Sequence, residues 1–156
     1  MMEEDSFFEI EVATAVNIPE LTNLFDAYRV FYEAASDPAA TQAFITRLIA
    51  EGNTHFFLAR ETKSSTAVGF VHLMPSIATV AMRPIWLLED LYVAPEARQQ
   101  GIAAALMRRA ETFARQTGAE RLTLATAHNN HKARALYRIL GYVQEDHFWY
   151  FHRILE

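Results

Sequence analysis

The sequence of 156 residues contains no cysteine, which excludes disulfide bonds, thiolate metal sites and a cysteine nucleophile. It also lacks an apolar run near the ~20 residues of a membrane-spanning helix. The first residues, MMEEDSFFEI, have neither the basic start nor the long apolar stretch of a secretory signal. An excess of positive charge is missing too, since the net charge is −5. We therefore expect a cytoplasmic protein that binds neither membranes nor nucleic acid.

Glycine and proline are scarce, at five residues each, and the chain has no repeat, linker or low-complexity segment. About half of the residues are apolar (51%), enough to build a core. Length and composition together predict a single domain over residues 1–156.

Hydrophobic periodicity predicts an alternation of strands and helices. The predicted strands cover residues 7–14, 55–60, 67–74, 84–93, 121–127 and 147–155. The predicted helices cover residues 17–35, 38–51, 101–118 and 129–142. Polar residues between the second and third strands indicate an antiparallel hairpin, and the later strand–helix–strand unit indicates a parallel pair. The fold class is therefore α/β, with a mixed, mostly antiparallel sheet of six to seven strands and about four flanking helices.

Capping residues mark two of the helices. Asn17 and Glu20 form an N-x-x-E pattern that predicts a capping box for the first helix. Asp37, followed by Pro38, predicts the start of the second helix, and Gly52 predicts its end.

The central strand at 84–93 runs into a polar corner, APEARQQGIA, and then directly into a helix. Gly101 permits a positive φ or a close approach of the backbone, Ala103 is nearly as small, and Arg98 adds positive charge. The first turn of a helix has unpaired N–H groups that attract anions. The corner is thus either a phosphate site or an ordinary strand–helix connection. The chain has no G-x-x-x-x-G-K-[ST] and no G-x-G-x-x-G, which argues against a P-loop NTPase and a dinucleotide fold.

Three segments together resemble the GCN5-related N-acetyltransferase (GNAT) family. RQQGIA resembles its R/Q-x-x-G-x-G/A signature, with Ala103 in place of a second glycine. NHKARALYRILGY is similar to its later N-x-x-A-x-x-L-Y-x-x-x-G-F/Y segment, and LEDLYV resembles a strand of the polyamine/histone acetyltransferase branch. The resemblance covers nearly the whole chain. It implies a GNAT-like fold and transfer of an acetyl group from acetyl-CoA to a primary amine.

The resemblance also implies where coenzyme A binds. Its pyrophosphate would lie on the backbone of Arg98, Gln99, Gln100, Gly101, Ile102, Ala103 and Ala104. Its pantetheine arm would run as a pseudo-strand beside Leu91, Tyr92 and Val93, between two splayed parallel strands. A backbone N–H near Leu91 or Tyr92 would point at the thioester oxygen, where it stabilises developing charge.

The later helix supplies further expected contacts. Asn130, Ala133 and Tyr137 share one face by helical spacing. In the resemblance, Asn130 would bond the pantetheine amides, Ala133 would let the coenzyme pass closely, and Tyr137 would give a proton to the leaving thiolate. The alternative for Tyr137 is a core aromatic with its hydroxyl at the surface.

Glu89 is the candidate base that deprotonates the incoming amine. It interrupts an apolar strand, where a carboxylate is unfavourable without a partner or a function. Regular alternation places it on one face with Leu87 and Leu91, and places Asp90 on the other face. The matching glutamate of the polyamine branch is the proposed base, and the alternative is a structural carboxylate. Asp90 itself is expected to be structural.

The expected acceptor site lies under the first two helices. Tyr28 and Tyr32, with acidic neighbours, form a candidate pocket for a cationic amine, and Trp86 is expected to face it beside Glu89. The alternative is that both tyrosines pack in the core.

The function that follows is acetyl transfer to a small-molecule amine in a ternary complex, without a covalent enzyme intermediate. The alternatives are acetylation of a protein lysine or N-terminus, and a coenzyme-binding sensor without catalysis. His128 and His131 lack a third ligand at a suitable spacing, so we expect no metal. The aromatic segment at 147–155 suggests a possible homodimer.

Overall fold

A computed structural model describes residues 6–156, and the chain divides between Ala125 and Thr126 into two compact units. The first unit contains β1 (Phe8–Val12), α1 (Ile18–Phe31), α2 (Pro38–Glu51), β2 (His55–Glu61), β3 (Ala67–Ala78), β4 (Arg83–Val93), α3 (Ile102–Gln116) and β5 (Leu122–Leu124). Short 3₁₀ turns at Ala15–Asn17 and Pro95–Ala97 precede α1 and α3. The second unit contains α4 (His131–Ile139).

The strands form one sheet in the order β1-β2-β3-β4-β5. The first four are antiparallel, and β4 and β5 are parallel. This confirms the α/β class and the mixed, mostly antiparallel sheet. The sheet has five strands among the described residues, fewer than the six to seven predicted.

The predicted strand at 147–155 accounts for this difference. The segment contains no helix or strand, and its large side chains are exposed. Aromatic and β-branched residues favour a strand only where a neighbouring strand pairs with them. The segment has the composition of a strand, but no strand pairs with it among residues 6–156.

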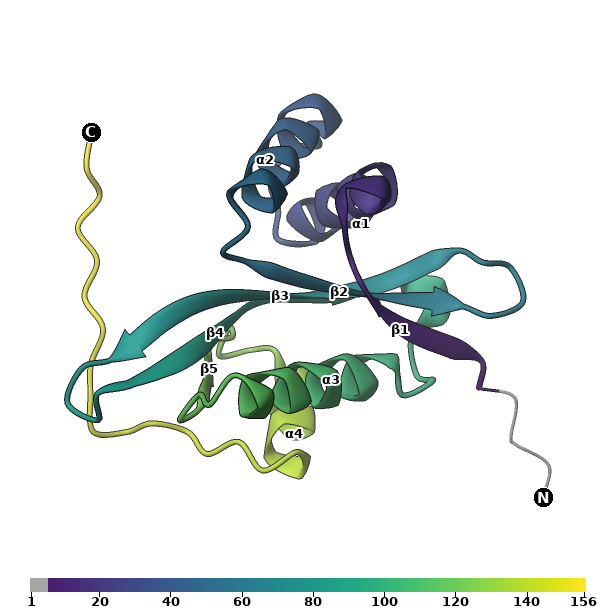
Figure 1. Ribbon diagram of the computed structural model, residues 1–156. Coiled ribbons are helices and arrows are strands. Elements are labelled where there is room, and N and C mark those ends of the chain that lie inside the picture. The colour runs from purple at the N-terminus through teal and green to yellow at the C-terminus, as the bar shows by residue number, and fades with distance from the viewer. Residues whose placement is uncertain (1–5) are drawn as a thin grey trace, which may run out of the picture. The chain divides into compact units, whose positions relative to one another are not determined.

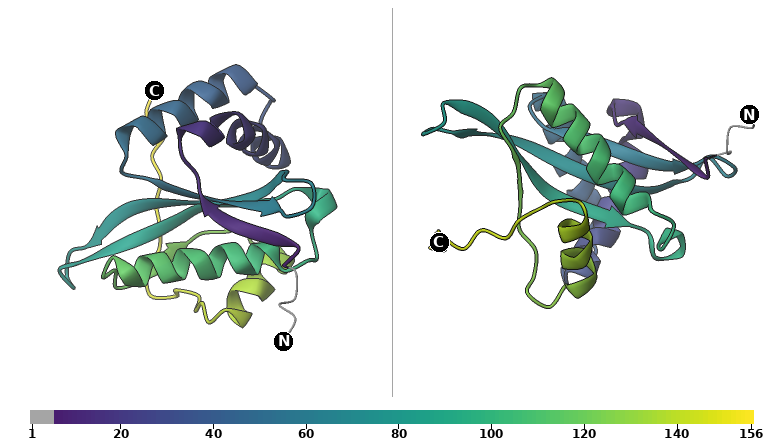
Figure 2. Two further views of the ribbon diagram at one scale, coloured as in Figure 1. Left: turned by 45° about the vertical axis from the view of Figure 1, so that its right-hand side comes forward. Right: turned by 90° about the horizontal axis from the view of Figure 1, so that it is seen from below.

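Helices cover both faces of the sheet in the first unit (Figures 1 and 2). Helices α1 and α2 pack on one face, where their buried apolar side chains meet those of the strands. This cluster comprises Leu21, Leu24, Phe25, Ile45, Leu48, Phe56, Leu58, Phe70, Tyr92 and Ala94. On the other face, α3 contacts β2, β3 and β4 and buries Ile102, Leu106, Met107, Ala110 and Ala114. We call these the α1–α2 face and the α3 face.

One predicted cap is confirmed and the other is wrong. The carboxylate of Asp37 accepts a hydrogen bond from the N–H of Ala40, and Gly52 ends α2 with φ +72°. Asn17 makes no cap bond to α1, because its Oδ1 accepts instead from the N–H of Thr14 at 2.9 Å. The side chain of Asn17 thus bonds to the residue before the 3₁₀ turn and does not cap α1.

Helix α1 ends at Phe31, short of the predicted end at residue 35. Asp26 explains the early end, since its carboxylate accepts bonds from the Ser36 hydroxyl at 2.6 Å and the Asp37 N–H at 2.8 Å. These bonds fold the α1–α2 connection back onto the helix. They also lower the pKa of Asp26, the Ser36 hydroxyl contributing most.

Within residues 6–156, no helix combines the length and the apolar character needed to span a membrane.

Candidate active site

The central strand β4 contains a β-bulge at Glu89. Asp90 lies opposite His72 on β3, but Leu88 lies opposite Leu73, so Glu89 is an extra residue without a partner on β3. Adjacent residues of β3 point to opposite faces, so Leu88 and Asp90 also lie on opposite faces.

The observed register corrects two expectations about the faces of β4. Leu87 and Leu91 lie on opposite faces, because they pair with Met74 and Val71 of β3. Trp86, expected to face the acceptor pocket under α1 and α2, lies on the α3 face. Its indole N–H donates to the Thr117 hydroxyl at 2.8 Å, and its ring packs against Phe113. Trp86 is therefore a core residue of the α3 face and does not border the expected acceptor pocket.

The two edges of β4 differ beyond the bulge. On one side, β3 pairs with β4 through to Val93. On the other side, pairing with β5 stops at Leu88 opposite Leu124. The edge of β4 from Glu89 to Val93 therefore has no strand neighbour on the β5 side among the described residues. This open edge includes Leu91, Tyr92 and Val93, where the sequence predicts strand addition by an extended ligand.

The corner after β4 exposes a run of backbone donors. Gly101 has φ +80° and Gln99 has φ +64°, so the chain turns twice through the left-handed region before α3 begins. A Cβ on Gly101 would meet nothing within 4 Å, which shows that the positive φ, and not a close contact within the chain, favours glycine here. The first backbone bond of α3 runs from the Ala105 N–H to the Gly101 carbonyl.

The N–H groups from Gln99 to Ala104 consequently donate no hydrogen bond within the described part of the chain. Unpaired N–H groups at a helix start, next to residues in the left-handed region, suit an anion. This stretch contains six of the seven residues predicted to hold the pyrophosphate. The N–H of the seventh, Arg98, donates to the Pro95 carbonyl at 3.4 Å.

The side chain of Arg98 was expected to add positive charge at the anion site of the corner, but it extends toward the end of α1. Its Nε donates to the Val93 carbonyl at 2.9 Å, and its guanidinium lies over the rings of Phe31 and Tyr92, at 5.5 and 5.7 Å. The side chain thus joins the corner to the end of α1 by cation–π contacts.

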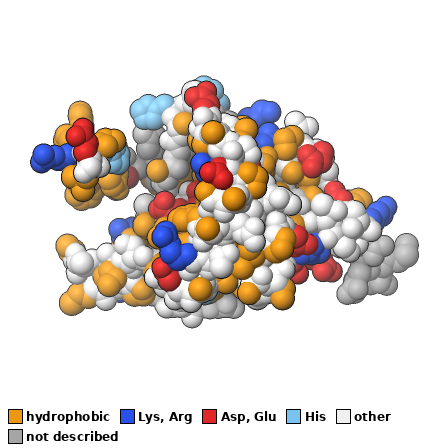
Figure 3. All heavy atoms as spheres, turned by 90° about the horizontal axis from the view of Figure 1, so that it is seen from above, with side chains coloured by type: hydrophobic (Ala, Val, Ile, Leu, Met, Phe, Trp, Pro, Cys, Tyr) orange, Lys and Arg blue, Asp and Glu red, His pale blue; other side chains and the backbone are white. Residues whose placement is uncertain are grey.

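An aromatic cluster lies at this end of α1. Tyr28 packs edge-to-face on Tyr32 at 5.0 Å between ring centroids, and it also contacts Phe70 and Tyr92. Tyr28 is half-buried, whereas Tyr32 and Phe31 are exposed at 50% and 56%. The two tyrosines combine both readings of the sequence, because one joins the core and the other presents its ring to solvent. Figure 3 shows acidic side chains interspersed with hydrophobic ones on this side of the molecule.

An open hollow of about 540 Å³ lies beside this cluster, between α1, the β2–β3 turn and the residues after β4. Glu20, Asn23 and Glu96 give it a polar, acidic lining, and Tyr92 is the only predicted site residue that borders it. Arg60 bonds to Glu20 and lowers the pKa of its carboxyl.

The two adjacent carboxylates of β4 have different surroundings. Glu89 is exposed, with no hydrogen bond or ion pair to any described residue. Asp90 accepts a bond from Nδ1 of His72 at 2.7 Å across the β3–β4 pair. The expected structural role of Asp90 thus has a visible partner. His72 was not identified from the sequence, because it meets Asp90 only through the strand register.

In the second unit, Asn130 caps α4 by accepting a bond from the Ala133 N–H. Tyr137 is half-buried, and its ring lies 6.1 Å from that of Tyr142. The predicted spacing of Asn130, Ala133 and Tyr137 therefore falls on one helix and its cap.

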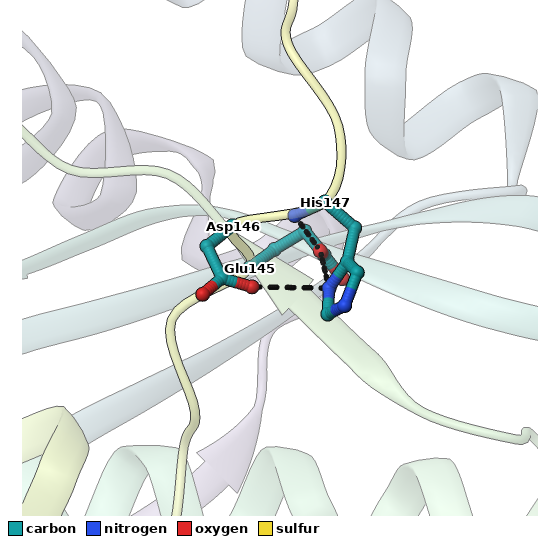
Figure 4. A group of neighbouring side chains, drawn as sticks. All are labelled: Glu145, Asp146 and His147. Atoms are coloured by element: carbon teal, nitrogen blue, oxygen red, sulfur yellow. Dashed lines mark hydrogen bonds and ion pairs between the residues drawn. The ribbon is translucent and has the colours of Figure 1, made fainter.

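Three exposed side chains gather near residue 146 (Figure 4). His147 Nδ1 lies 3.0 Å from a carboxylate oxygen of Glu145 and 3.0 Å from one of Asp146. The backbone N–H of His147 also donates to Glu145 and lowers the pKa of that carboxyl. The three residues are consecutive and bond to one another, so their proximity is explained without a metal ion.

Comparison with known proteins supports the resemblance. Residues 19–142 match the family model described as the acetyltransferase (GNAT) family. The uncharacterized N-acetyltransferase YhfO of Bacillus subtilis is 36% identical over 139 residues, which cover 89% of this chain and 92% of that protein. A probable acetyltransferase of Haemophilus influenzae is 35% identical over 115 residues, covering 74% and 78% of the two chains. A crystal structure of a probable acetyltransferase superposes with a TM-score of 0.90 at 30% identity, over 95% of this chain and 98% of that one.

Proposed function

Since the chain belongs to the acetyltransferase (GNAT) family and is an acyl-CoA-dependent N-acetyltransferase, we propose that it moves the acetyl group of acetyl-CoA to the primary amine of a small molecule. One observation carries the proposal. The open edge of β4 from Glu89 to Val93 leads directly into the unpaired N–H groups of 99–104. A ligand with an extended arm joined to a diphosphate fits both features in this order, with the arm along the open edge and the diphosphate on the N–H groups.

The diphosphate would be held by backbone N–H groups from Gln99 to Ala104, at the positive end of the α3 dipole. The pantetheine amides would pair with Leu91, Tyr92 and Val93 along the open edge. In the second unit, Asn130 and Ala133 would contact the same arm. The coenzyme supplies a thioester, whose carbonyl carbon the amine attacks.

The chain's own groups then handle charge and protons. A backbone N–H at Leu91 or Tyr92 would donate to the thioester oxygen and stabilise its developing charge. The phenol of Tyr137 would give its proton to the departing sulfur, since a thiolate is basic enough to accept it. The amine must first lose a proton from its ammonium form, and the exposed carboxylate of Glu89 is one candidate to take it.

The acceptor would bind on the α1–α2 face. The exposed rings of Tyr32 and Phe31 and the acidic lining of the neighbouring hollow favour a cation. Arg98 already occupies two of the aromatic faces, which shows that the cluster accommodates a positive charge. A small amine of the polyamine type fits these features.

The proposal includes a cytoplasmic homodimer. The exposed side chains of Phe148, Trp149 and Phe151 support it, since a monomer rarely leaves such a group of aromatics in water. Sedimentation of the full chain and of a chain ending at residue 146 would test this, because only the full chain should dimerise.

A screen of acceptors tests the function. Purified protein is mixed with acetyl-CoA and, one at a time, with spermidine, lysine, a D-amino acid, an aminoglycoside and a lysine-containing peptide, and thiol release is followed. We expect release with one or more small amines. Transfer to the peptide alone would favour a protein acetyltransferase, and coenzyme binding without transfer to any amine would favour a sensor.

A Tyr137→Phe variant sharpens the screen. It removes only the phenol oxygen, so the coenzyme should bind with an unchanged dissociation constant. Turnover should fall about 10- to 1,000-fold, in line with general-acid effects. A wild-type rate in this variant would remove Tyr137 from the mechanism.

A further inference from the structure

His72 is a buried imidazole with one satisfied nitrogen and one unsatisfied nitrogen. The residue is only 2% exposed. Its Nδ1 lies 2.7 Å from Asp90 Oδ2, whereas its Nε2 has no hydrogen-bond partner among residues 6–156. Buried polar atoms are rarely left unpaired in folded proteins, so this atom calls for an explanation.

The contacts of the ring determine its tautomer. An ionised carboxylate only accepts hydrogen bonds, so Nδ1 carries the proton that is shared with Asp90. In the neutral ring, Nε2 then has the free lone pair and acts as a base. The ring is also fixed in orientation, because it stacks on Phe56 of β2 at 4.1 Å between centroids and at 4° between planes.

The pair lies beneath α1 and α2, next to the stretch of β4 that forms the open edge. His72 lies opposite Asp90, which stands between the bulge residue Glu89 and Leu91 on β4. Both side chains are on the α1–α2 face, with Tyr92 two residues further along. The same stretch of β4 forms the open edge. We propose that Nε2 of His72 takes the proton from the acceptor's ammonium group, directly or through one water, while Asp90 holds the ring and stabilises the imidazolium.

The proton balance of this step is simple. The ammonium group transfers one proton to Nε2, which yields a neutral amine and an imidazolium ion. The amine's lone pair then attacks the thioester carbon and the C–S bond breaks. The second proton that the nitrogen loses on becoming an amide replaces the one that Tyr137 gives to the sulfur, and the imidazolium returns its proton to solvent after the product leaves. An imidazole is in general more basic than a carboxylate by about two pKa units, which suits it to accept a proton from an ammonium group.

The surrounding charges are compatible with this role. On the β2 side, the imidazole ring stacks on the apolar side chain of Phe56. On the β4 side, the ring is hydrogen-bonded to Asp90. The buried carboxylate on the helices of this face, Asp26, is already bonded to Ser36 and to the backbone at residue 37. The titratable or charged side chains of the elements packed at this face are Glu20, Asp26, Tyr28, Arg29, Arg47 and Glu51 on α1 and α2, His55, Arg60 and Glu61 on β2, and Arg83, Glu89, Asp90 and Tyr92 on β4, with Tyr32 directly after α1. Among these side chains, Asp90 is the one that bonds to His72.

This inference rests on the proposed function, and the experiment separates the two. It measures kcat/KM against pH with acetyl-CoA and spermidine, or the amine of the panel that gives the fastest transfer. His72→Asn is the informative variant, since its amide N–H still donates to Asp90 but has nothing at the Nε2 position and does not titrate. We expect about a 100-fold loss in kcat/KM and the disappearance of the acidic limb of the profile.

Two further variants assign the effect. Asp90→Asn should also lower kcat/KM, because the ring loses the carboxylate that fixes its tautomer and orientation, whereas Glu89→Gln should keep the acidic limb. His55→Asn is the matched control, as His55 is a partly buried imidazole of the same sheet on the α3 face, packed on Phe113. Burial lowers the pKa of His55, and its loss should leave the profile unchanged.

Outcomes are distinguishable. If the wild-type protein transfers acetyl groups and His72→Asn keeps both rate and pH profile, the assignment to His72 is wrong and the function stands. If the wild type transfers to no amine, the proposed function itself fails. Nitrogen-15 NMR of the free protein gives a readout independent of activity. We expect a proton on Nδ1 of His72, and a proton on Nε2 instead would overturn the inference.

Discussion

The two faces of the sheet are built differently. The α3 face is apolar throughout its centre, with Leu106 and Ala110 fully buried and Met107 nearly so. The α1–α2 face has a similar apolar base, but it also buries the polar side chains of Asp26 and His72. Burying polar groups lowers stability unless they are paired, and among the described residues Asp26 is paired whereas Nε2 of His72 is not. The α3 face holds β4 in place, and the α1–α2 face carries the proposed acceptor site.

A Leu106→Ala variant should give the largest effect on stability. The side chain is fully buried against β3, and its removal leaves a cavity in the apolar centre of this face. We expect the free energy of unfolding to fall by about 3 kcal/mol in urea denaturation. Leu155→Ala is the control, since Leu155 is 84% exposed and its loss should have little effect. A loss under about 1 kcal/mol at Leu106 would mean that the α3 face is not the rigid support described.

Gly69 tests how tightly the α3 face holds β4. A Cβ at this position would lie 2.9 Å from the Tyr92 carbonyl oxygen, which is main chain and has little freedom to move. Gly69→Ala should therefore lower stability by about 2 kcal/mol through overpacking and weaken coenzyme A binding by displacing the open edge. Gly118→Ala is the contrast, because a Cβ there meets nothing, only φ (+75°) opposes it, and the residue lies outside the proposed coenzyme site. Equal losses of coenzyme binding in calorimetry would contradict the steric account of Gly69.

Asp26 tests the polar side of the comparison. Its pKa is lowered in the folded state, chiefly by the Ser36 hydroxyl, so the ionised carboxylate stabilises the fold above its unfolded pKa of about 3.9. This contribution disappears as the pH falls through the folded pKa. Asp26→Asn should lower Tm by several degrees at pH 7, and the difference from wild type should shrink as the pH falls below about 4. Asp146→Asn, at an exposed acid, is the control and should leave Tm at pH 7 nearly unchanged.

The contact between Arg98 and Phe31 should have the smallest effect. A double-mutant cycle with Phe31→Leu and Arg98→Gln should give a coupling of about 0.5 kcal/mol in thermal unfolding, as exposed cation–π pairs do. A coupling above about 2 kcal/mol would make this contact part of the core and weaken the distinction between the faces.

Local chemistry made much of the fold predictable. Asp37, Pro38 and Gly52 mark the bounds of α2, because capping and a left-handed φ depend on neighbours in the sequence. The apolar run at 84–93 predicted a central strand, and Gly101 predicted the turn into α3. The coenzyme residues follow from motifs of the same local kind, and their roles stay predictions.

Long-range pairing explains what the sequence did not reveal. The bulge at Glu89 exists only in the register between β4 and β3, so Leu91 and Trp86 were assigned to the wrong faces. His72 and Asp90 stand 18 residues apart and meet through the same register. The segment at 147–155 has the composition of a strand but no partner among the described residues. Composition indicates what a segment can pair with, and only the assembled sheet shows whether it does.

The extra residue in β4 divides this strand into two frames of opposite phase. Before it, Trp86 and Leu88 point toward α3, and after it, Asp90 and Tyr92 point toward α1. Deleting Glu89 would leave a regular strand but would reverse the faces of one of its halves. Either the Trp86 indole would then point toward α1, or the Asp90 carboxylate would point toward α3. The irregularity is thus what lets a single strand serve two incompatible layers at once.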